Sequence, residues 1–171
     1  MTQNCACPEH FPQWHEQDID LSGKTVLALK IPSFLYMPLS YDSYVQRQLS
    51  DLAQLELSEQ WPGLVMTRTG FLRGEIMRLL TPGNSPSRYV KPLSAPFNVR
   101  GYLHNGGIGS IRESTRQLQM QLFDNGRMPK ELYLCYLSCP LCCEKKGGDK
   151  ILLLRRWNES PTLKKRLQKN S

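Results

Sequence analysis

A strand pattern occupies residues 24–31, which read Lys24-Thr-Val-Leu-Ala-Leu-Lys-Ile31. One face of this strand is made by every second residue, namely Thr25, Leu27, Leu29 and Ile31. Alternation of this kind predicts a strand that packs one face on a core. A second strand is predicted about 70 residues later, at Phe97-Asn-Val-Arg-Gly-Tyr-Leu103, so an internal duplication is indicated.

A helix is expected after the first strand, from about Asp42, with Ser40 in the position of an N-cap. Its apolar residues recur at helical spacing, at Val45, Leu49 and Leu52. The dipeptide Pro62-Gly63 marks a break after this helix. Two strands then follow at residues 64–69 and 75–80, and the glycines between them predict a turn.

The second half of the chain repeats this order of elements. A glycine-rich turn at residues 104–110 leads into a helix, which Asn125-Gly126 should end with a left-handed residue. The helical face consists of Ile111, Thr115, Leu118 and Leu122. Strands at residues 132–137 and 151–157 complete this half.

Together these patterns predict an α+β domain of two βαββ repeats, which form a largely antiparallel sheet with the helices on one side. The first repeat spans about residues 24–81 and the second about residues 97–157. Residues 82–96 hold four prolines and predict a surface connection. Residues 158–171 predict a basic, flexible tail.

Size and composition fit a single globular domain at residues 1–157. With 171 residues and 40% hydrophobic content, the chain can bury a core of its own. Its first residues do not resemble a signal peptide, and its apolar stretches are shorter than the about 20 residues that span a bilayer. We therefore expect a cytoplasmic protein with no membrane partner.

The net charge of +7 is concentrated toward the C-terminus. The basic residues there are Lys145, Lys146, Lys150, Arg155, Arg156, Lys164, Lys165, Arg166 and Lys169. A basic tail can attract nucleic acid, although a solvated terminus is the simpler explanation.

Two close pairs of cysteines stand far apart in the sequence, at Cys5-Ala6-Cys7 and at Cys139-Pro140-Leu141-Cys142. Two thiolate pairs complete a tetrahedral shell around one metal ion, and four thiolates leave no open position for water or substrate. We therefore predict a structural zinc site that ties the N-terminal segment to the last hairpin. Lys145 and Lys146 follow closely and would offset its negative charge.

Other assignments of the cysteines stay open. His10 and Cys143 are reserve ligands for the metal. A redox role for Cys139 and Cys142 is the rival interpretation, but a redox pair usually opens a helix, whereas this pair follows a strand. Cys135 lies within an apolar strand and is expected in the core. Reduced cysteines without a metal are the simplest alternative.

Three segments resemble a bacterial family whose members are often labelled hydrolases. These segments are Cys5-Ala-Cys-Pro-Glu-His-Phe-Pro-Gln-Trp14, Phe34-Leu-Tyr-Met-Pro-Leu39 and Tyr136-Leu-Ser-Cys-Pro-Leu-Cys142. The resemblance covers most of residues 5–157, and its specific part is the two cysteine pairs with their prolines. Cys143 departs from the family pattern, which usually has a small residue there.

The duplicated βαββ pattern separately resembles the gyrase-inhibitor-like, effector-binding fold, which is similar to the SOUL haem-binding fold. This resemblance implies a small apolar or cationic ligand in a cleft between the two halves, often with a glutamate in the cleft. Glu75, within a predicted strand, is the acid that we assign to this role.

Aromatic residues on or beside the predicted strands are candidates for the lining of such a cleft. They include Tyr36, Tyr102, Tyr136 and Trp157, with Phe34 and Tyr133 as further members. Core packing is the better explanation for each of them taken alone, and their joint placement between two halves is what indicates a pocket. His104 opens the glycine-rich turn, where exposed N–H groups before a helix favour an anion, although such turns are also ordinary connections.

From the sequence we therefore predict a domain that binds an unidentified small molecule between its repeats and carries a structural zinc ion. A hydrolase or other enzyme that uses the same cleft is the first alternative. The sequence contains no Gly-x-Ser-x-Gly motif, no His-Glu-x-x-His motif and no nucleotide-binding motif. A nucleic-acid-binding accessory protein is the second alternative.

Overall fold

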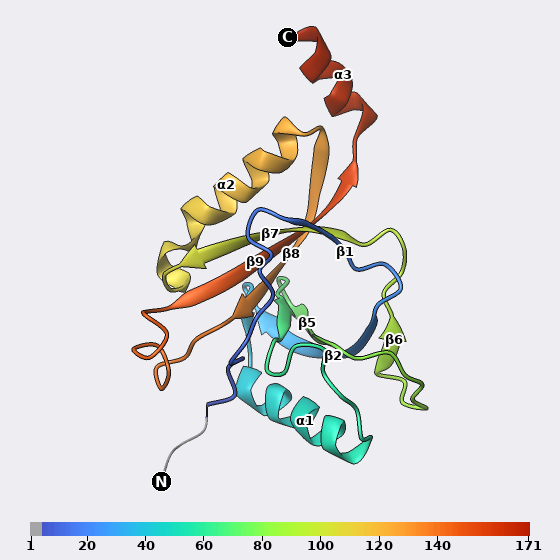
Figure 1. Cartoon of the computed structure of the whole chain (residues 1–171), viewed down its shortest axis with the longest axis vertical. Coiled ribbons are helices and arrows are strands. Elements are labelled where there is room, and N and C mark those ends of the chain that lie inside the picture. The colour runs from blue at the N-terminus through green and yellow to red at the C-terminus, as the bar shows by residue number, and fades with distance from the viewer. Residues whose placement is uncertain (1–4) are drawn as a thin grey trace.

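The structure of the protein is a computed structural model that describes residues 5–171 (Figure 1). These residues form an α+β fold with a nine-stranded antiparallel sheet and three α-helices, which confirms the predicted fold class. The strands are β1 (Asp18–Asp20), β2 (Thr25–Phe34), β3 (Met37–Pro38), β4 (Met66–Arg68), β5 (Arg73–Leu79), β6 (Val90–Pro92), β7 (Asn98–Asn105), β8 (Arg127–Tyr136) and β9 (Lys150–Glu159). The helices are α1 (Tyr41–Gln54), the short 3₁₀ helix η1 (Ile108–Ser110), α2 (Ile111–Asp124) and α3 (Pro161–Lys169).

Two βαββ halves build the sheet, β2-α1-β4-β5 and β7-α2-β8-β9. The strand order is β1-β7-β9-β8-β4-β5-β2-β3, with β6 paired to β2 beside this path. The halves meet where β4 lies beside β8, and the pair that joins them is Thr67 with Leu134. The two halves therefore share one continuous sheet.

Both large helices cover the same face of this sheet. Residues paired across neighbouring strands lie on one face, and a row of such pairs crosses the sheet from β2 to β7. Its members are Leu29, Ile76, Thr67, Leu134, Leu153 and Tyr102. Val45 of α1 packs on Leu29 and Ile76, and Leu118 of α2 packs on Leu153. This arrangement agrees with the predicted helices on one side.

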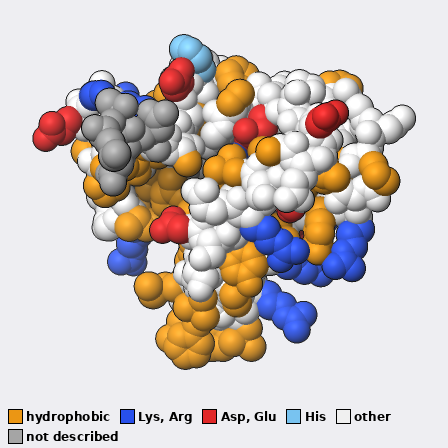
Figure 2. Space-filling model, turned by 90° about the horizontal axis from the view of Figure 1, so that it is seen from below, with side chains coloured by type: hydrophobic (Ala, Val, Ile, Leu, Met, Phe, Trp, Pro, Cys, Tyr) orange, Lys and Arg blue, Asp and Glu red, His pale blue; other side chains and the backbone are white. Residues whose placement is uncertain are grey.

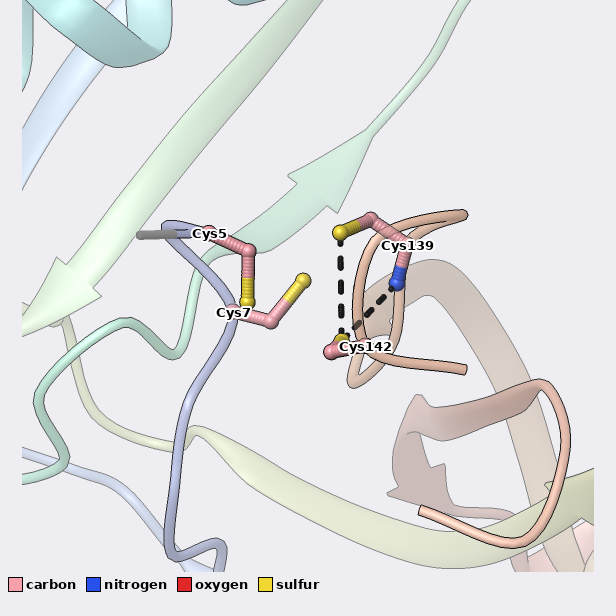
Figure 3. Close-up of side chains that lie close together, drawn as sticks. All are labelled: Cys5, Cys7, Cys139 and Cys142. Carbon is pink, nitrogen blue, oxygen red and sulfur yellow. Dashed lines mark hydrogen bonds between the residues drawn. The ribbon is translucent and has the colours of Figure 1, made fainter. Parts of the chain in front are cut away.

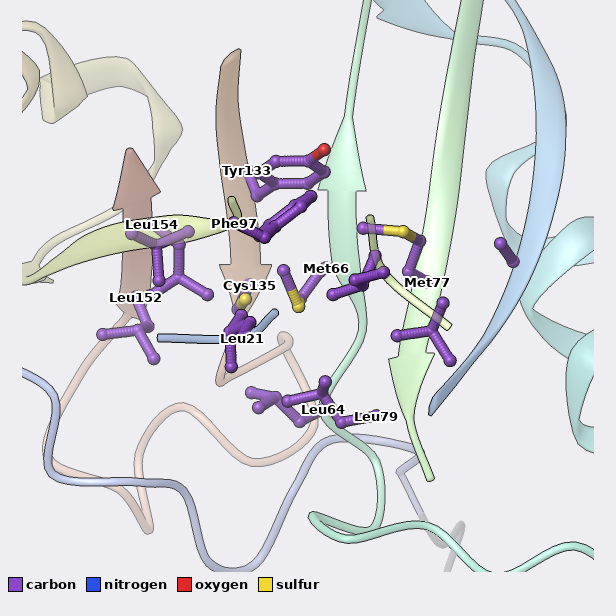
Figure 4. Packing of buried hydrophobic residues seen from close by; sticks show 14 of the residues in the cluster. Leu21, Leu64, Met66, Met77, Leu79, Phe97, Tyr133, Cys135, Leu152 and Leu154 are labelled. Carbon is purple, nitrogen blue, oxygen red and sulfur yellow. The ribbon is translucent and has the colours of Figure 1, made fainter. Parts of the chain in front are cut away.

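The opposite face of the sheet encloses the main hydrophobic core (Figure 4). Both halves contribute to it, with Met66 and Met77 from the first and Cys135 and Leu152 from the second. Residues of the N-terminal segment, which we define as residues 5–23, complete this core, and Leu21 is buried within it. On this face of the sheet, the space between the two halves is therefore filled by side chains of the core.

Several local features differ from the sequence expectations. Ser40 stands at the N-cap of α1, but its φ of 54° is left-handed and its side chain makes no capping hydrogen bond. The surface connection 82–96 contains β6, which extends the edge of β2. Gly126 ends α2 with a φ of 68°, as expected.

The basic tail contains a helix. Ser160 caps α3 by accepting a hydrogen bond from the backbone N–H of Leu163, and no residue of α3 is buried. Figure 1 shows α3 projecting from the end of the molecule opposite to the start of the N-terminal segment. Nucleic-acid binding by this tail stays a prediction.

No helix within residues 5–171 is both long enough and apolar enough to cross a membrane.

Candidate metal centre and pockets

The N-terminal cysteines are held in place by close backbone packing. Cys5 and Cys7 belong to an irregular segment that lies directly on Gly63. A Cβ atom on Gly63 would stand 2.9 Å from the carbonyl oxygen of Ala6 and 2.9 Å from the nitrogen of Pro8. Gly63 also has a φ of 85°, so only glycine fits this position without strain.

The other two cysteines lie in a turn between β8 and β9. Two backbone N–H groups, from Cys142 and Cys143, donate to the carbonyl oxygen of Cys139 at 3.1 and 2.9 Å and form this turn. The ammonium group of Lys146 connects the turn to the N-terminal segment, because it donates to the carbonyl oxygens of Pro8 and Leu137 at 2.7 Å each. Lys146 thus ties two backbone segments together beside the cysteines.

Four sulfur atoms meet at this point, from Cys5, Cys7, Cys139 and Cys142 (Figure 3). All four Sγ atoms lie within 4.8 Å of one another, and those of Cys139 and Cys142 are 3.8 Å apart. Zinc–sulfur bonds of about 2.3 Å in a tetrahedron place sulfur atoms about 3.8 Å apart. The predicted meeting of the two cysteine pairs is therefore confirmed, with a spacing that suits a metal ion.

The electrostatics of the cluster also favour a cation. Burial, together with hydrogen bonds that the thiol of Cys7 donates to the sulfur atoms of Cys139 and Cys142, raises the pKa of Cys7. Burial also raises the pKa of Cys142, but the backbone N–H of Cys139, 3.3 Å from its Sγ, and the surrounding thiols lower that pKa to about 7. Four thiolates this close repel one another, so a bound divalent cation stabilises the ionised set.

The alternative assignments of the cysteines can be compared with this geometry. The cluster consists of four cysteines, and neither His10 nor Cys143 is a member of it. Cys139 and Cys142 lie in turns and not at the start of a helix, as we expected. Cys135 is fully buried in the core, and burial raises its pKa. All six cysteines are free of disulfides.

Three of the aromatic residues predicted to line a cleft belong to the second half, and each makes a different packing contact. Tyr102 packs edge-on against His15, with ring centroids 4.9 Å apart. Tyr136 contacts Tyr41 of α1 in the same manner at 6.1 Å. Trp157 is buried beneath the guanidinium group of Arg127, which lies 4.0 Å from the centre of its ring.

The remaining predicted ligand residues are also dispersed. His104 is buried below the start of α2. Tyr36 lies in an exposed turn and contacts Phe71. Glu75 lies between Arg68 at 3.8 Å and Lys91 at 3.7 Å. Tyr102 and Tyr136 share the α2 face of the sheet, but the other contacts are distinct, so a cleft between the halves stays a prediction.

Glu75 does reach a pocket, at the edge of the first half. This pocket of about 370 Å³ opens along the middle of β2, between the stretch that pairs with β6 and the stretch that pairs with β3. Its lining consists of Ala28, Leu29, Lys30, Tyr44, Arg47, Glu75, Arg88, Tyr89 and Lys91. We call it the Tyr89 pocket. Four cationic side chains surround a single carboxylate in it.

Tyr89 organises the arginines of this pocket. Its hydroxyl group accepts hydrogen bonds from Arg88 at 2.9 Å and from Arg47 at 3.4 Å. Both guanidinium groups also lie over its ring, at 5.0 and 5.7 Å from the centroid. The hydrogen bond from Arg88 lowers the pKa of Tyr89. None of these three residues was predicted, because α1 and the connection 82–96 meet only through the fold.

A second polar cluster surrounds His104 at the start of α2. Its Nδ1 atom lies 2.7 Å from Oγ of Ser114, and its Nε2 atom lies 3.0 Å from Oγ of Ser110. The carbonyl oxygen of Gly107 is also 3.0 Å from Nε2. Ser110 is exposed, whereas His104 is buried. An exposed hydroxyl group therefore contacts an imidazole ring that hydrogen bonds hold in place.

A family model described as Bacterial hydrolase matches residues 1–156. The chain belongs to this family. The match agrees with the resemblance of the cysteine pairs to proteins labelled hydrolases. A comparison with curated proteins finds no match.

Two solved structures have a similar fold. The C-terminal domain of EcmrR, in a crystal structure, aligns with a TM-score of 0.60 and 11% identity, covering 83% of this chain and 96% of that domain. The EcmrR–DNA complex in EcmrR-RPo, seen by cryo-EM, aligns with a TM-score of 0.53 and 12% identity, covering 83% of this chain and 56% of that one. This chain thus spans about half the length of the second protein. The similarity to the gyrase-inhibitor-like and SOUL folds stays a prediction.

Proposed function

We propose that this protein binds a small organic anion in the Tyr89 pocket, on a fold whose N-terminal segment is fastened by a structural zinc ion. The observation that carries the binding proposal is the charge of the pocket. Lys30, Arg47, Arg88 and Lys91 line it against Glu75 alone. Arginine forks suit carboxylate and phosphate groups, and Tyr44 and Tyr89 offer aromatic surface beside them.

This charge pattern changes the expected ligand class. The resemblance to effector-binding folds implied an apolar or cationic ligand near a glutamate. Here the carboxylate of Glu75 is already paired with Arg68 and Lys91. Its negative charge is therefore compensated within the protein, and the arginines beside Tyr89 favour an anion.

Binding can be tested by isothermal titration with benzoate and inorganic phosphate, and with tetraphenylphosphonium as the cationic comparison. We expect an anion to bind and Arg88→Gln to weaken it by about tenfold, the value of one charge-assisted contact. Arg166→Gln, which removes the same charge from exposed α3, should leave the affinity unchanged. Equal binding by both variants, or binding of the cation alone, would rule out this pocket as an anion site.

The zinc proposal rests on the closed set of four thiolates. Such a set selects zinc among abundant divalent metals, and it leaves no coordination position for substrate. We therefore assign the metal a role in stability and none in catalysis. Removal of the metal should release the N-terminal segment from the β8–β9 turn.

The His104 cluster favours a second candidate function, hydrolysis of an ester or related bond. The carbonyl oxygen of Gly107 can only accept a hydrogen bond, so its contact with Nε2 requires Nε2–H and leaves Nδ1 to accept from Ser114. For Nε2 to accept the proton of Ser110, the imidazole must take the other tautomer and give up the contact with Gly107. The exposed hydroxyl group of Ser110 would then act as nucleophile with His104 as general base. The name of the matched family supports this candidate. Among residues 5–171, no carboxylate forms an ion pair with His104.

A panel of nitrophenyl esters tests this candidate. Hydrolysis by the wild type should be lost in Ser110→Ala, while Ser114→Ala should keep part of it, because Ser114 only orients the imidazole. A fluorophosphonate probe should label Ser110 in the wild type. Absence of both turnover and labelling would leave His104 a structural residue that fastens the turn to α2.

A further inference from the structure

Two neighbouring turns of the first half expose an unusual amount of apolar surface. The exposed residues are Phe34 (55%), Leu35 (54%), Tyr36 (64%), Met37 (69%), Leu39 (47%), Phe71 (53%) and Leu72 (60%). They lie in or beside the β2–β3 turn and in the β4–β5 turn, and we together call these residues the apolar tip. Figure 2 shows apolar side chains gathered in a projection at the lower edge of one face, with Lys and Arg side chains nearby.

The two turns of the apolar tip contact each other and form one structural unit. The backbone N–H of Ser33 donates to the carbonyl oxygen of Leu72 at 3.0 Å, so the first turn is joined to the second. The rings of Tyr36 and Phe71 pack edge-to-face with centroids 6.1 Å apart. Both turns therefore present their side chains to the same side.

The β2–β3 turn holds its bulky side chains at an energetic disadvantage. Leu35 and Tyr36 have φ values of 49° and 66°, which is the left-handed region that such a turn requires. Asparagine and glycine are the residues favoured at these two positions. Strained backbone of this kind points to a use for the side chains outside the fold.

The charges around the apolar tip indicate what it contacts. No charged residue lies within residues 31–41 or 69–72. The charged residues that flank these stretches are Lys30, Asp42, Arg68 and Arg73, of which three are cationic. A second copy of the chain would bring the same cationic flank against this one. An anionic surface is therefore the better complement.

We propose that the apolar tip inserts into the surface of an anionic lipid bilayer. A convex projection of Phe, Leu, Tyr and Met side chains can enter the boundary between headgroups and acyl chains, to a depth of about 5–10 Å. The phenol of Tyr36 suits the headgroup level, and Lys30 and Arg73 would lie against anionic headgroups. The apolar stretches of the sequence are too short to span a bilayer, but binding at its surface needs no spanning segment.

Flotation of the full-length, metal-loaded protein with vesicles tests the proposal. The wild type should bind vesicles of equal parts phosphatidylglycerol and phosphatidylcholine, bind less in high salt, and bind weakly to phosphatidylcholine alone. Replacing the turn by Leu35→Asn with Tyr36→Gly removes two apolar side chains yet favours the same turn. This variant should bind anionic vesicles about tenfold more weakly and unfold at an unchanged or higher temperature.

The matched control removes exposed apolar side chains elsewhere. Ile108 is 56% exposed and Met120 is 44% exposed, both at α2 and its short preceding helix. Ile108→Asn with Met120→Gln should bind vesicles as the wild type does. Failure of the wild type to bind anionic vesicles, or equal binding by the turn variant, would overturn the proposal. A dimer of the wild type in sedimentation that the turn variant abolishes, without vesicle binding, would assign the tip to a second copy and also overturn it.

Discussion

Arg78 is a buried cation whose contacts join several elements of the first half. Only 1% of this residue is exposed beneath α1. Its Nε atom donates to Gln48 at 3.1 Å, and one terminal nitrogen forms an ion pair with Glu59 at 2.7 Å. Gln48 in turn donates to the backbone carbonyl oxygens of Leu27 and Ile76. These contacts join α1, β2 and β5 through polar groups.

Removal of this cation should be costly. We expect Arg78→Ala to lower the free energy of unfolding by about 3 kcal/mol, because it leaves the carboxylate of Glu59 without its cation and Oε1 of Gln48 without its donor in a buried site. Arg73→Ala, at an exposed position of the same strand, should change it by less than about 0.5 kcal/mol. Urea denaturation of both variants measures the difference. Equal stability of the two variants would show that the buried ion pair adds nothing.

At the scale of an element, Gly101 allows the N-terminal segment to lie on β7. His15 forms a bridge to Gly101 of β7, and the backbone N–H of Gly101 donates to Gln17 at 3.0 Å. A Cβ atom on Gly101 would stand 2.1 Å from the carbonyl oxygen of Trp14. The segment therefore lies on β7 only because this residue has no side chain.

Gly101→Ala should accordingly push the N-terminal segment away from the sheet. We expect the free energy of unfolding to fall by about 2 kcal/mol through this overpacking. Gly109→Ala is the matched control, since a Cβ atom at that glycine meets nothing within 4 Å. Thermal unfolding monitors both variants. A stable Gly101→Ala protein with a protected N-terminal segment in limited proteolysis would contradict this account.

Long elements with a regular pattern were predictable from sequence, and short edge elements were not. The spacing of Val45 and Leu52 predicted α1, and the alternation from Thr25 predicted β2. In contrast, β1 and β6 are strands of three residues each that exist because β7 and β2 offer them free edges. Such pairing depends on the tertiary fold and leaves no periodic signal in the sequence.

At the scale of the whole molecule, the same contrast separates the two candidate sites. The cluster of four cysteines was predictable, because two close pairs of cysteines are typical of metal ligands and can be recognised wherever they stand in the sequence. The Tyr89 pocket was not, because Arg47 and Arg88 are ordinary surface residues until β2, β6 and α1 bring them together. A prediction of the strands alone does not place these two arginines together.

The metal would join parts of the molecule that are distant in sequence but not its two termini. Cys5 and Cys7 meet the β8–β9 turn, whereas α3 lies at the opposite end (Figure 1). A zinc ion there would bind the N-terminal segment to the β8–β9 turn of the second half. The same segment completes the core through Leu21. Metal binding and folding should therefore be coupled.

Native mass spectrometry of the protein, produced without added metal, tests this coupling most directly. We predict one zinc ion per chain, lost when Cys7→Ser is introduced and retained in Cys143→Ser, which changes the neighbouring cysteine outside the cluster. A wild-type protein that carries no metal, or a Cys143→Ser protein that loses it while Cys7→Ser keeps it, would contradict the four-cysteine zinc centre.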